Sequence, residues 1–133
     1  MEKIILDTNF LLVPMQFKVD IFSEMERICH FNYKIYVYEQ TINELKEIAN
    51  KQSGKDKKAA LLALKLISLK SITIIKNSKD RIVDDIILEN LDKNMIVATL
   101  DKDLKTKLLE KKAAVIFLRQ KKYLEIFGRK LYK

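Results

Sequence analysis

Hydrophobic positions along the chain alternate between two spacings, which predict strands and helices in turn. Short runs of β-branched, aromatic and other apolar residues predict strands at 3–6, 33–40, 71–77, 94–100 and 113–119. Apolar residues at helical spacing predict helices at about 17–29, 42–49, 59–69, 82–91 and 101–112. Strands that alternate with helices predict an α/β fold with a mainly parallel sheet.

One predicted helix, 59–69, carries more apolar side chains than a single helix face can bury. We expect it to be deeply covered, either within the chain, by a second copy of the chain, or by a ribosomal partner. Closed two-fold pairing is the commonest form of self-association. The pattern therefore predicts a homodimer.

Composition limits the classes of protein that remain. A length of 133 residues suits one domain, and two glycines cannot build a P-loop or a dinucleotide-binding loop. The net charge of +8 favours a polyanionic partner such as RNA, DNA or anionic lipid. A single cysteine, Cys29, forms no internal disulfide, and the sequence shows neither a signal peptide nor a membrane span. We expect a soluble, cytoplasmic protein without membrane contact.

Four acidic residues fall at positions that a parallel sheet would bring together. Asp7 follows the first strand and Asp101 follows the strand at 94–100, while Glu44 and Asp84 lie near the starts of helices that follow strands. Ligands of open parallel sheets bind outside the carboxyl ends of the strands, where strand order reverses. The four acids are therefore expected to converge on one pocket at that edge.

Each acid also has a purely structural alternative. Asp7 could form an Asx-turn, Thr41 and Glu44 match a helix capping box, and Asp101 could be an N-cap. Asp84 or its neighbour Asp85 could favour the positive end of a helix. Their joint placement favours a shared pocket, where carboxylates repel unless a cation compensates, and oxygen-only ligands select hard ions such as Mg²⁺ or Mn²⁺. Such ions activate water for phosphodiester hydrolysis.

Four segments, "ILDTNFLL", "TINELKEI", "VDDIILEN" and "IVATLDKDLK", resemble in order the four acidic motifs of PIN-domain nucleases, across residues 1–120. The stretches "DTNFLLVPMQFKVDIFSEMERI" and "VIFLRQKKYLEIFG" further resemble the archaeal branch related to small-subunit ribosomal RNA processing PIN proteins. The resemblance implies a three-layer α/β/α sandwich (PIN-like) and an Mg²⁺- or Mn²⁺-dependent endoribonuclease.

The resemblance also assigns roles residue by residue. The catalytic, metal-binding carboxylates would be Asp7, Glu44, Asp84 and Asp101, and Asp103, a further acid of the last motif, would be an additional metal ligand. Supporting roles would fall to Thr8 and Thr99, whose hydroxyls would orient Asp7 and Asp101, and to Asn9 and Asp85. Alignment of the D-x-x-I motif favours Asp84 over Asp85, because Ile87 then points to the core.

The end of the chain is strongly basic, and we divide it from the domain at 1–120 as an extension, 121–133, packed on or flanking it. Its candidate RNA-binding residues are Arg119, Lys121, Lys122, Arg129 and Lys130, interleaved with aromatic side chains. In an alternative interpretation, Leu124, Phe127 and Leu131 lie at helical spacing and only pack against the core.

The leading interpretation is an endoribonuclease that cuts single-stranded or structured RNA, foremost in ribosomal RNA processing, with a ribosome-assembly protein as a further partner. One alternative is a toxin-type PIN ribonuclease, and another is a PIN-fold scaffold that binds RNA or assembling ribosomes and cuts little alone. A phosphotransfer enzyme or receiver domain with a nucleophilic Asp7 is disfavoured, since the haloacid-dehalogenase motif needs an acid where Asn9 stands.

Overall fold

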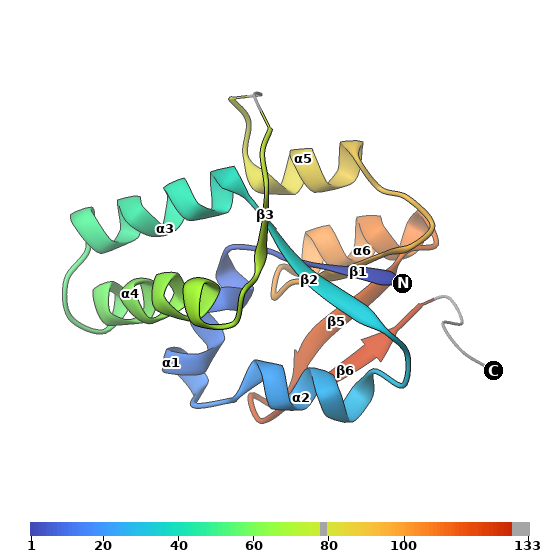
Figure 1. Cartoon of the computed structure of the whole chain (residues 1–133), viewed down its shortest axis with the longest axis horizontal. Coiled ribbons are helices and arrows are strands. Elements are labelled where there is room, and N and C mark those ends of the chain that lie inside the picture. Colours follow the sequence, from blue (N-terminus) through green and yellow to red (C-terminus); the bar gives the residue numbers. More distant parts are fainter. Residues whose placement is uncertain (78–79, 129–133) are drawn as a thin grey trace.

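A six-stranded sheet forms the centre of the computed structural model, which describes residues 1–77 and 80–128 (Figure 1). The strands are β1 (Glu2–Leu6), β2 (Tyr33–Tyr38), β3 (Thr73–Ile75), β4 (Met95–Ala98), β5 (Ala114–Arg119) and β6 (Tyr123–Phe127). Their order is β3-β2-β1-β4-β5-β6, and every neighbouring pair is parallel except β5 and β6. The predicted mainly parallel α/β fold is confirmed.

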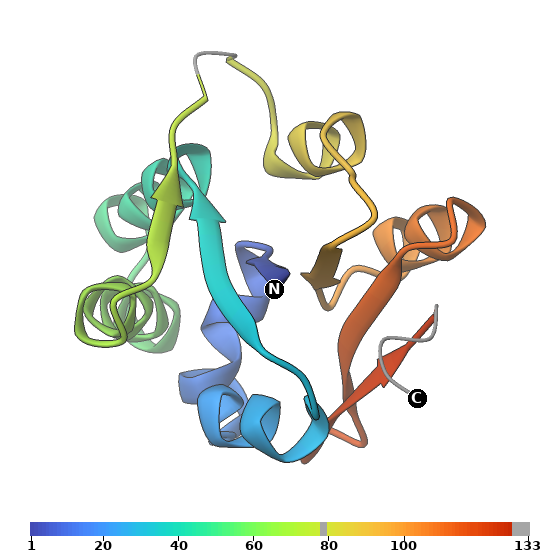
Figure 2. The ribbon, with the colours of Figure 1, turned by 45° about the vertical axis from the view of Figure 1, so that its right-hand side comes forward.

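Helices cover both faces of this sheet, which gives the expected three layers (Figure 2). They are η1 (Asn9–Leu12), α1 (Val13–Phe17), α2 (Ile21–Ile28), α3 (Glu39–Lys51), α4 (Gly54–Leu69), α5 (Val83–Glu89) and α6 (Lys102–Glu110). Ile4 and Leu6 of β1 face the core shared with η1 and α1–α4, whereas Ile5 faces the core shared with α5 and α6. Successive residues of a strand point to opposite faces, so β1 is buried on both sides.

The strand order reverses beside β1. The chain passes from β1 to β2 and β3 on one side and then returns to place β4 on the other side, where Leu6 pairs with Ala98. Residues that follow β1 and β4 therefore leave adjacent strands at the same edge. This is the switch point at which open α/β sheets bind their ligands.

The end of the described chain differs from one sequence interpretation. Leu124 and Phe127 fit a helical spacing, but they lie on β6, which runs antiparallel to β5 after a tight turn. Gln120 and Lys121 in that turn have φ of 53° and 58°. No glycine marks the turn, so the hairpin signal that the sequence usually carries is absent. The short helices η1 and α1 were not predicted either.

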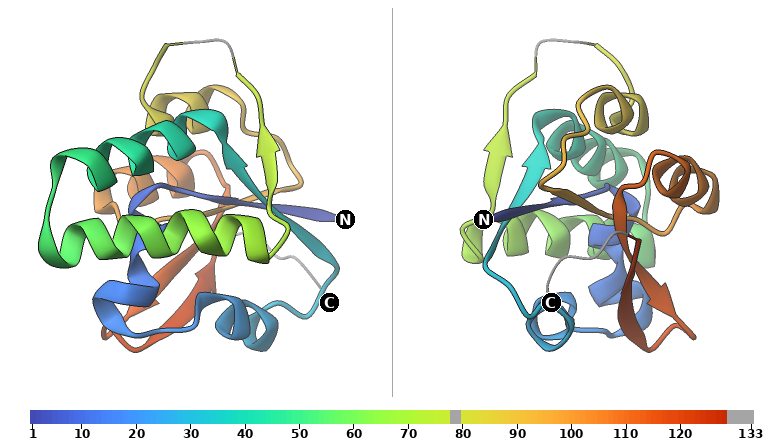
Figure 3. Two further views of the ribbon diagram at one scale, coloured as in Figure 1. Left: turned by 60° about the vertical axis from the view of Figure 1, so that its left-hand side comes forward. Right: turned by 90° about the vertical axis from the view of Figure 1, so that its right-hand side faces the viewer.

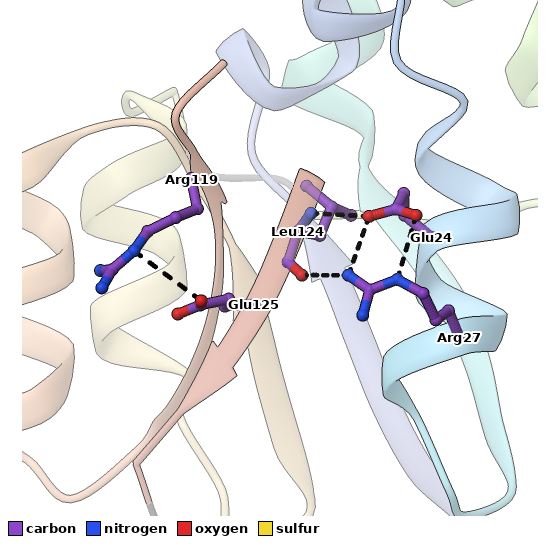
Figure 4. Close-up of polar contacts among 5 residues, drawn as sticks. All are labelled: Glu24, Arg27, Arg119, Leu124 and Glu125. Atoms are coloured by element: carbon purple, nitrogen blue, oxygen red, sulfur yellow. Dashed lines mark hydrogen bonds and ion pairs between the residues drawn. The ribbon is translucent and has the colours of Figure 1, made fainter. Parts of the chain in front are cut away.

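Edge strand β6 is fastened to α2 by two charged side chains (Figure 4). The Glu24 carboxylate accepts from the Leu124 backbone N–H at 2.9 Å, and the Arg27 guanidinium donates to the Leu124 carbonyl at 2.8 Å. Arg27 also donates to both oxygens of Glu24, at 3.1 and 2.9 Å. We call these contacts the α2–β6 clamp.

Helix α4, which contains the apolar stretch 59–69, lies beside α3 and buries a stripe of small residues (Figure 3). Ala59, Ala60 and Ala63 are almost fully buried, whereas Leu61 and Leu69 are 49% and 66% exposed. The expectation that this helix is deeply covered within the chain is thus only half met. Across the described residues, none of the helices has the length and apolar character needed to cross a membrane.

Candidate functional site

Asp7 leaves β1 as a buried carboxylate with defined partners. Its backbone N–H donates to the Ala98 carbonyl at 2.9 Å, which holds it beside the end of β4. Its side chain accepts from the Thr8 N–H at Oδ1 (2.9 Å) and from the Thr99 hydroxyl at Oδ2 (2.7 Å). The residue is only 3% exposed, so both oxygens are fixed in place by the sheet and its first connection.

Asp101 is connected to Asp7 through Thr99. The Thr99 hydroxyl, which donates to Asp7, accepts from the Asp101 backbone N–H at 3.0 Å. Asp101 is the N-cap of α6, and its Oδ1 accepts from the Leu104 N–H at 3.0 Å. The capping alternative for Asp101 is therefore present in the structure, and it uses one of the two carboxylate oxygens. Asn9 contributes nearby, since its Oδ1 accepts from the Leu100 N–H at 3.3 Å.

Glu44 reaches the same edge from α3. Its Oε1 accepts from the Thr8 hydroxyl at 2.5 Å, and that hydroxyl lies 3.2 Å from the Thr41 hydroxyl. The capping-box alternative for Thr41 and Glu44 is wrong, because α3 begins at Glu39 and Thr41 is fully buried inside the helix. Glu44 thus lies in the second turn, and the Thr8 hydroxyl orients Glu44, whereas the backbone N–H of Thr8 contacts Asp7.

Electrostatics show that Asp84, in the first turn of α5, belongs to the same group. Burial, together with the charges of Asp84 and Glu44, raises the pKa of Asp7 to about 7 against the opposing hydrogen bonds from Thr99 and Thr8. The pKa of Asp84 is also raised, first by burial and then by the charge of Asp101, while a hydrogen bond with Asp7 opposes the rise. Four carboxylates from separate segments therefore act on one another.

The donor chemistry of this group fits a hard divalent cation. The four grouped carboxylates offer oxygen, the donor that Mg²⁺ and Mn²⁺ prefer, and a cation would offset the repulsion that contributes to the raised pKa of Asp7 and Asp84. Within residues 1–77 and 80–128, no three His, Cys, Asp or Glu side chains form a complete metal cluster as they stand. Metal ligation by these residues remains a prediction.

Two further predicted acids are placed differently, although the charge of Asp85 is the smallest of the causes that raise the pKa of Asp84. Asp85 forms an ion pair with Arg81 at 3.7 Å, and Asp103 is exposed in the first turn of α6. Residues two apart on a helix point in different directions, so Asp103 does not share the face of Asp101. Ile87 is fully buried, as expected if Asp84 and not Asp85 faces the site.

Three of the predicted cations lie at the end of β5 and in the turn that follows it. Since β5 is parallel to β4, its carboxyl end and the turn that follows lie on the same side of the sheet as the acids. Arg119 is exposed and pairs with Glu125 at 3.7 Å (Figure 4), and Lys121 and Lys122 are exposed in the turn. Arg129 and Lys130 lie outside the described residues.

Two cavities flank Glu44, and sequence reasoning did not single out their basic residues. One, of about 280 Å³, is lined by Gln40, Asn43, Glu44, Glu47, Asp80, Arg81 and Ile82. The other, of about 340 Å³, is lined by Thr8, Glu44, Glu47, Ile48, Lys51 and Gln52. Gln40, Glu44, Glu47 and Lys51 recur every three or four residues, so they form one stripe of α3. That polar spacing was the available sequence signal.

Comparisons with known proteins agree with this architecture. The chain is similar to ribonuclease VapC4 of Methanocaldococcus jannaschii, with 38% identity over 131 residues that cover 96% of this chain and 98% of the relative. It is similar in fold to the PIN domain endonuclease Utp24, with a TM-score of 0.79, 19% identity, and coverage of 96% and 92% of the two chains. A domain of a functionally unknown M. jannaschii protein has a TM-score of 0.59 and 14% identity, with coverage of 100% and 97%.

The family comparison covers the segments that supply all four acids. A family model described as "PIN like domain" matches residues 4–121, from β1 to the turn after β5. Together with the extended similarity to ribonuclease VapC4, this match shows the family. The chain belongs to the PIN-like domain family.

Proposed function

We propose that this protein is a metal-dependent endoribonuclease that hydrolyses RNA phosphodiester bonds. The observation that carries the proposal is the gathering of Asp7, Glu44, Asp84 and Asp101 at the switch point, with Asp7 buried and its pKa raised to about 7. Family membership and the 38% identity to a ribonuclease support RNA as the substrate.

In the proposed mechanism, Asp7, Glu44, Asp84 and Asp101 would hold Mg²⁺ or Mn²⁺, and the bound ion would supply activation of water and stabilisation of the leaving oxygen. The protein's own residues supply the geometry. Thr99 fixes Asp7 and the backbone of Asp101 together, and Thr8 fixes Glu44. Such supporting hydrogen bonds orient carboxylate ligands and increase the affinity of a site for its metal.

Lys121, Lys122 and Arg119 are proposed to bind the RNA backbone at the same edge of the sheet as the acids. Their exposed positions at the carboxyl end of β5 suit contacts with phosphates, which release counterions and make affinity fall with salt. The replacement of Lys121 and Lys122 by Gln should weaken binding to different RNAs by similar factors and make the log–log salt slope shallower by roughly two units. Arg129 and Lys130 are proposed to act in the same way.

Cleavage of defined RNAs tests the proposal. Single-stranded oligonucleotides and ribosomal RNA fragments are incubated with the protein and Mn²⁺ or Mg²⁺, beside an EDTA control and Asp7→Asn. Internal cuts that need both the metal and Asp7 support the proposal. RNA binding without any cutting would instead support the scaffold alternative, in which the PIN fold binds RNA or a ribosome-assembly partner.

Two proposals for the biological role, ribosomal RNA processing and a toxin-type activity, differ in the RNA that is cut. A role in ribosomal RNA processing predicts preferred cutting of ribosomal RNA precursors at few sites, as the resemblance of the N- and C-terminal motifs suggests. A toxin-type role predicts efficient cutting of a mature cellular RNA and growth arrest on expression. Sequencing of the cut ends from total RNA distinguishes these two patterns.

Homodimerisation stays a prediction. Leu61 and Leu69 on α4 expose apolar surface, and a cavity of about 400 Å³ between α1, α2 and α4 is lined in part by Phe22, Leu62 and Leu66. Sedimentation at high micromolar concentration measures the outcome, and a monomer under those conditions would contradict it.

A further inference from the structure

Arg81 lies two residues before α5 and borders the cavity that Glu44 also lines. Its guanidinium pairs with Asp85 at 3.7 Å and with Glu89, so it bridges two acids on successive turns of α5. The side chain remains 44% exposed. Ion pairs at such exposed positions contribute little stability, so these pairs can be exchanged for another anion at low cost.

Lys51 ends α3 and borders the second cavity, on the other side of Glu44. Glu44 and Glu47 line both cavities, so the two openings meet along one stripe of α3. Glu44 and Lys51 are seven residues apart, or roughly 10 Å along the helix axis. One cation therefore lies at each end of a polar groove that passes the acidic site.

We propose that a single RNA strand lies along this stripe of α3, with Arg81 and Lys51 binding phosphates on opposite sides of the bond that is cut. This inference rests on the proposed nuclease function and adds the path of its substrate. Acids at the centre of the groove repel the RNA backbone, so phosphates that flank the cut bond need cations of their own.

Arg81 suits this role better than a lysine would. A guanidinium binds a phosphate through two parallel N–H···O bonds, as it binds a carboxylate. The phosphate of an arriving strand would take the place of Asp85 and Glu89. In the free protein these acids hold Arg81 at the groove.

A purely structural role for Arg81 makes a different prediction. α5 is short and has no side-chain N-cap hydrogen bond, and Arg81 could serve only to stabilise its acidic turns. In that case Arg81→Gln would lower the melting temperature and leave the affinity for RNA unchanged.

RNA affinity in EDTA, where no metal-dependent cleavage occurs, tests the inference. The probe is a fluorescently labelled single-stranded RNA oligonucleotide of mixed sequence, followed by anisotropy. Arg81→Gln and Lys51→Gln should each weaken binding by about tenfold at low salt and make the salt slope shallower by roughly one unit. Lys46→Gln is the matched control, because Lys46 is exposed on the same helix and lines neither cavity. Equal losses for Lys46→Gln and Lys51→Gln would overturn the proposed path.

If phosphate and carboxylate compete for Arg81, removal of a carboxylate should strengthen RNA binding. Glu89→Gln removes a partner of Arg81, so it should strengthen RNA binding about threefold, a modest exposed-pair effect. In a protein that already carries Arg81→Gln, Glu89→Gln should give little gain in RNA affinity, because the guanidinium for which phosphate and Glu89 compete is absent. An equal gain in both backgrounds would show only general charge repulsion and would overturn the assignment of Arg81. Arg81→Lys should recover part of the affinity.

Truncated substrates test whether the two cations lie on opposite sides of the cut. For an RNA shortened on one side of a mapped cut, one of the two substitutions, Arg81→Gln or Lys51→Gln, should no longer reduce the affinity. For an RNA shortened on the other side, the other substitution should have no effect. Sensitivity to both substitutions with both RNAs would overturn the path. If the protein cut no RNA, the nuclease proposal would fail, and the binding measurements in EDTA would still test the groove.

Discussion

The acidic site and the α2–β6 clamp both use carboxylates, but their environments are opposite. In the clamp, the Arg27 hydrogen bonds are the main reason that the pKa of Glu24 is lowered, and Glu24 in turn raises the pKa of Arg27. At the acidic site, burial and neighbouring carboxylates raise the pKa of Asp7 and Asp84. In the clamp, a carboxylate and a guanidinium attract each other and together hold a strand. At the acidic site, the carboxylates repel one another. Perturbed carboxylates of the second kind are typical of functional sites.

The largest expected difference between the two regions is in activity. Asp7→Asn should reduce metal-dependent RNA cleavage by more than roughly 100-fold, because even supporting partners of metal ligands account for roughly 10- to 100-fold. Glu24→Gln should leave the cleavage rate within about twofold at a temperature where both variants are folded. Rates under saturating RNA measure this contrast, and a Glu24→Gln rate as low as that of Asp7→Asn would remove it.

The second largest difference between the acidic site and the clamp is expected in stabilisation by a bound metal ion. Mn²⁺ or Mg²⁺ at 100 times its dissociation constant should stabilise the wild-type protein by about 2.7 kcal/mol. The same metal should stabilise Glu24→Gln equally and Asp7→Asn much less, because only Asp7 belongs to the acidic group. Thermal unfolding with and without metal at constant ionic strength provides the measurement. Equal stabilisation of all three proteins would mean that the ion binds elsewhere.

The pH dependence of stability provides a third contrast, measured in EDTA. Since Asp7 has a pKa of about 7 when folded against 3.8 as the ordinary value, the folded state loses stability as pH rises from about 4 to 7. Asp7→Asn removes this cost, and we expect it to be more stable than wild type at pH 8 by on the order of 2 kcal/mol. Each pKa unit corresponds to about 1.4 kcal/mol, and part is offset by weaker hydrogen bonds. The gain should vanish near pH 4, so equal gains at pH 4 and pH 8 would contradict the assignment.

The smallest effect is expected in the clamp, with the opposite sign. Glu24→Gln should destabilise the protein at neutral pH by about 1 kcal/mol, because the charge-assisted bonds to Arg27 and to the Leu124 N–H are weakened. The pKa of Glu24 is lowered in the folded state, so this contribution is present above the ordinary value of 4.5 and fades as pH falls below it. Melting temperatures of the two proteins at pH 7 and at pH 3 should therefore converge at the lower pH.

Some of these features could be predicted from sequence because they depend on local patterns. The continuously apolar run of β4 predicts a strand buried in a parallel sheet. The positions of Asp7 and Asp101 directly after strands predict that both lie at the same edge of that sheet. The contact of Thr8 with Glu44 could not be predicted, since it joins side chains 36 residues apart and depends on how α3 packs. Strand β6 could be mistaken for a helical segment, because Leu124 and Phe127 are three residues apart, a spacing that places two side chains on one face of a helix but on opposite faces of a strand. In β6, Leu124 is buried and Phe127 is exposed, and the preceding turn lacks the glycine that would indicate a hairpin.

The α2–β6 clamp also bears on how the protein avoids association through its sheet. An edge strand offers unpaired N–H and C=O groups on which a strand of another molecule can add, a common start of aggregation. On β6, both outward-facing backbone groups of Leu124 are bound by Glu24 and Arg27, and the opposite edge strand, β3, is only three residues long. A single Glu–Arg pair on α2 thus covers the Leu124 backbone groups on the longer of the two edge strands, so its loss should favour fibre-like assembly more than its small effect on stability would suggest.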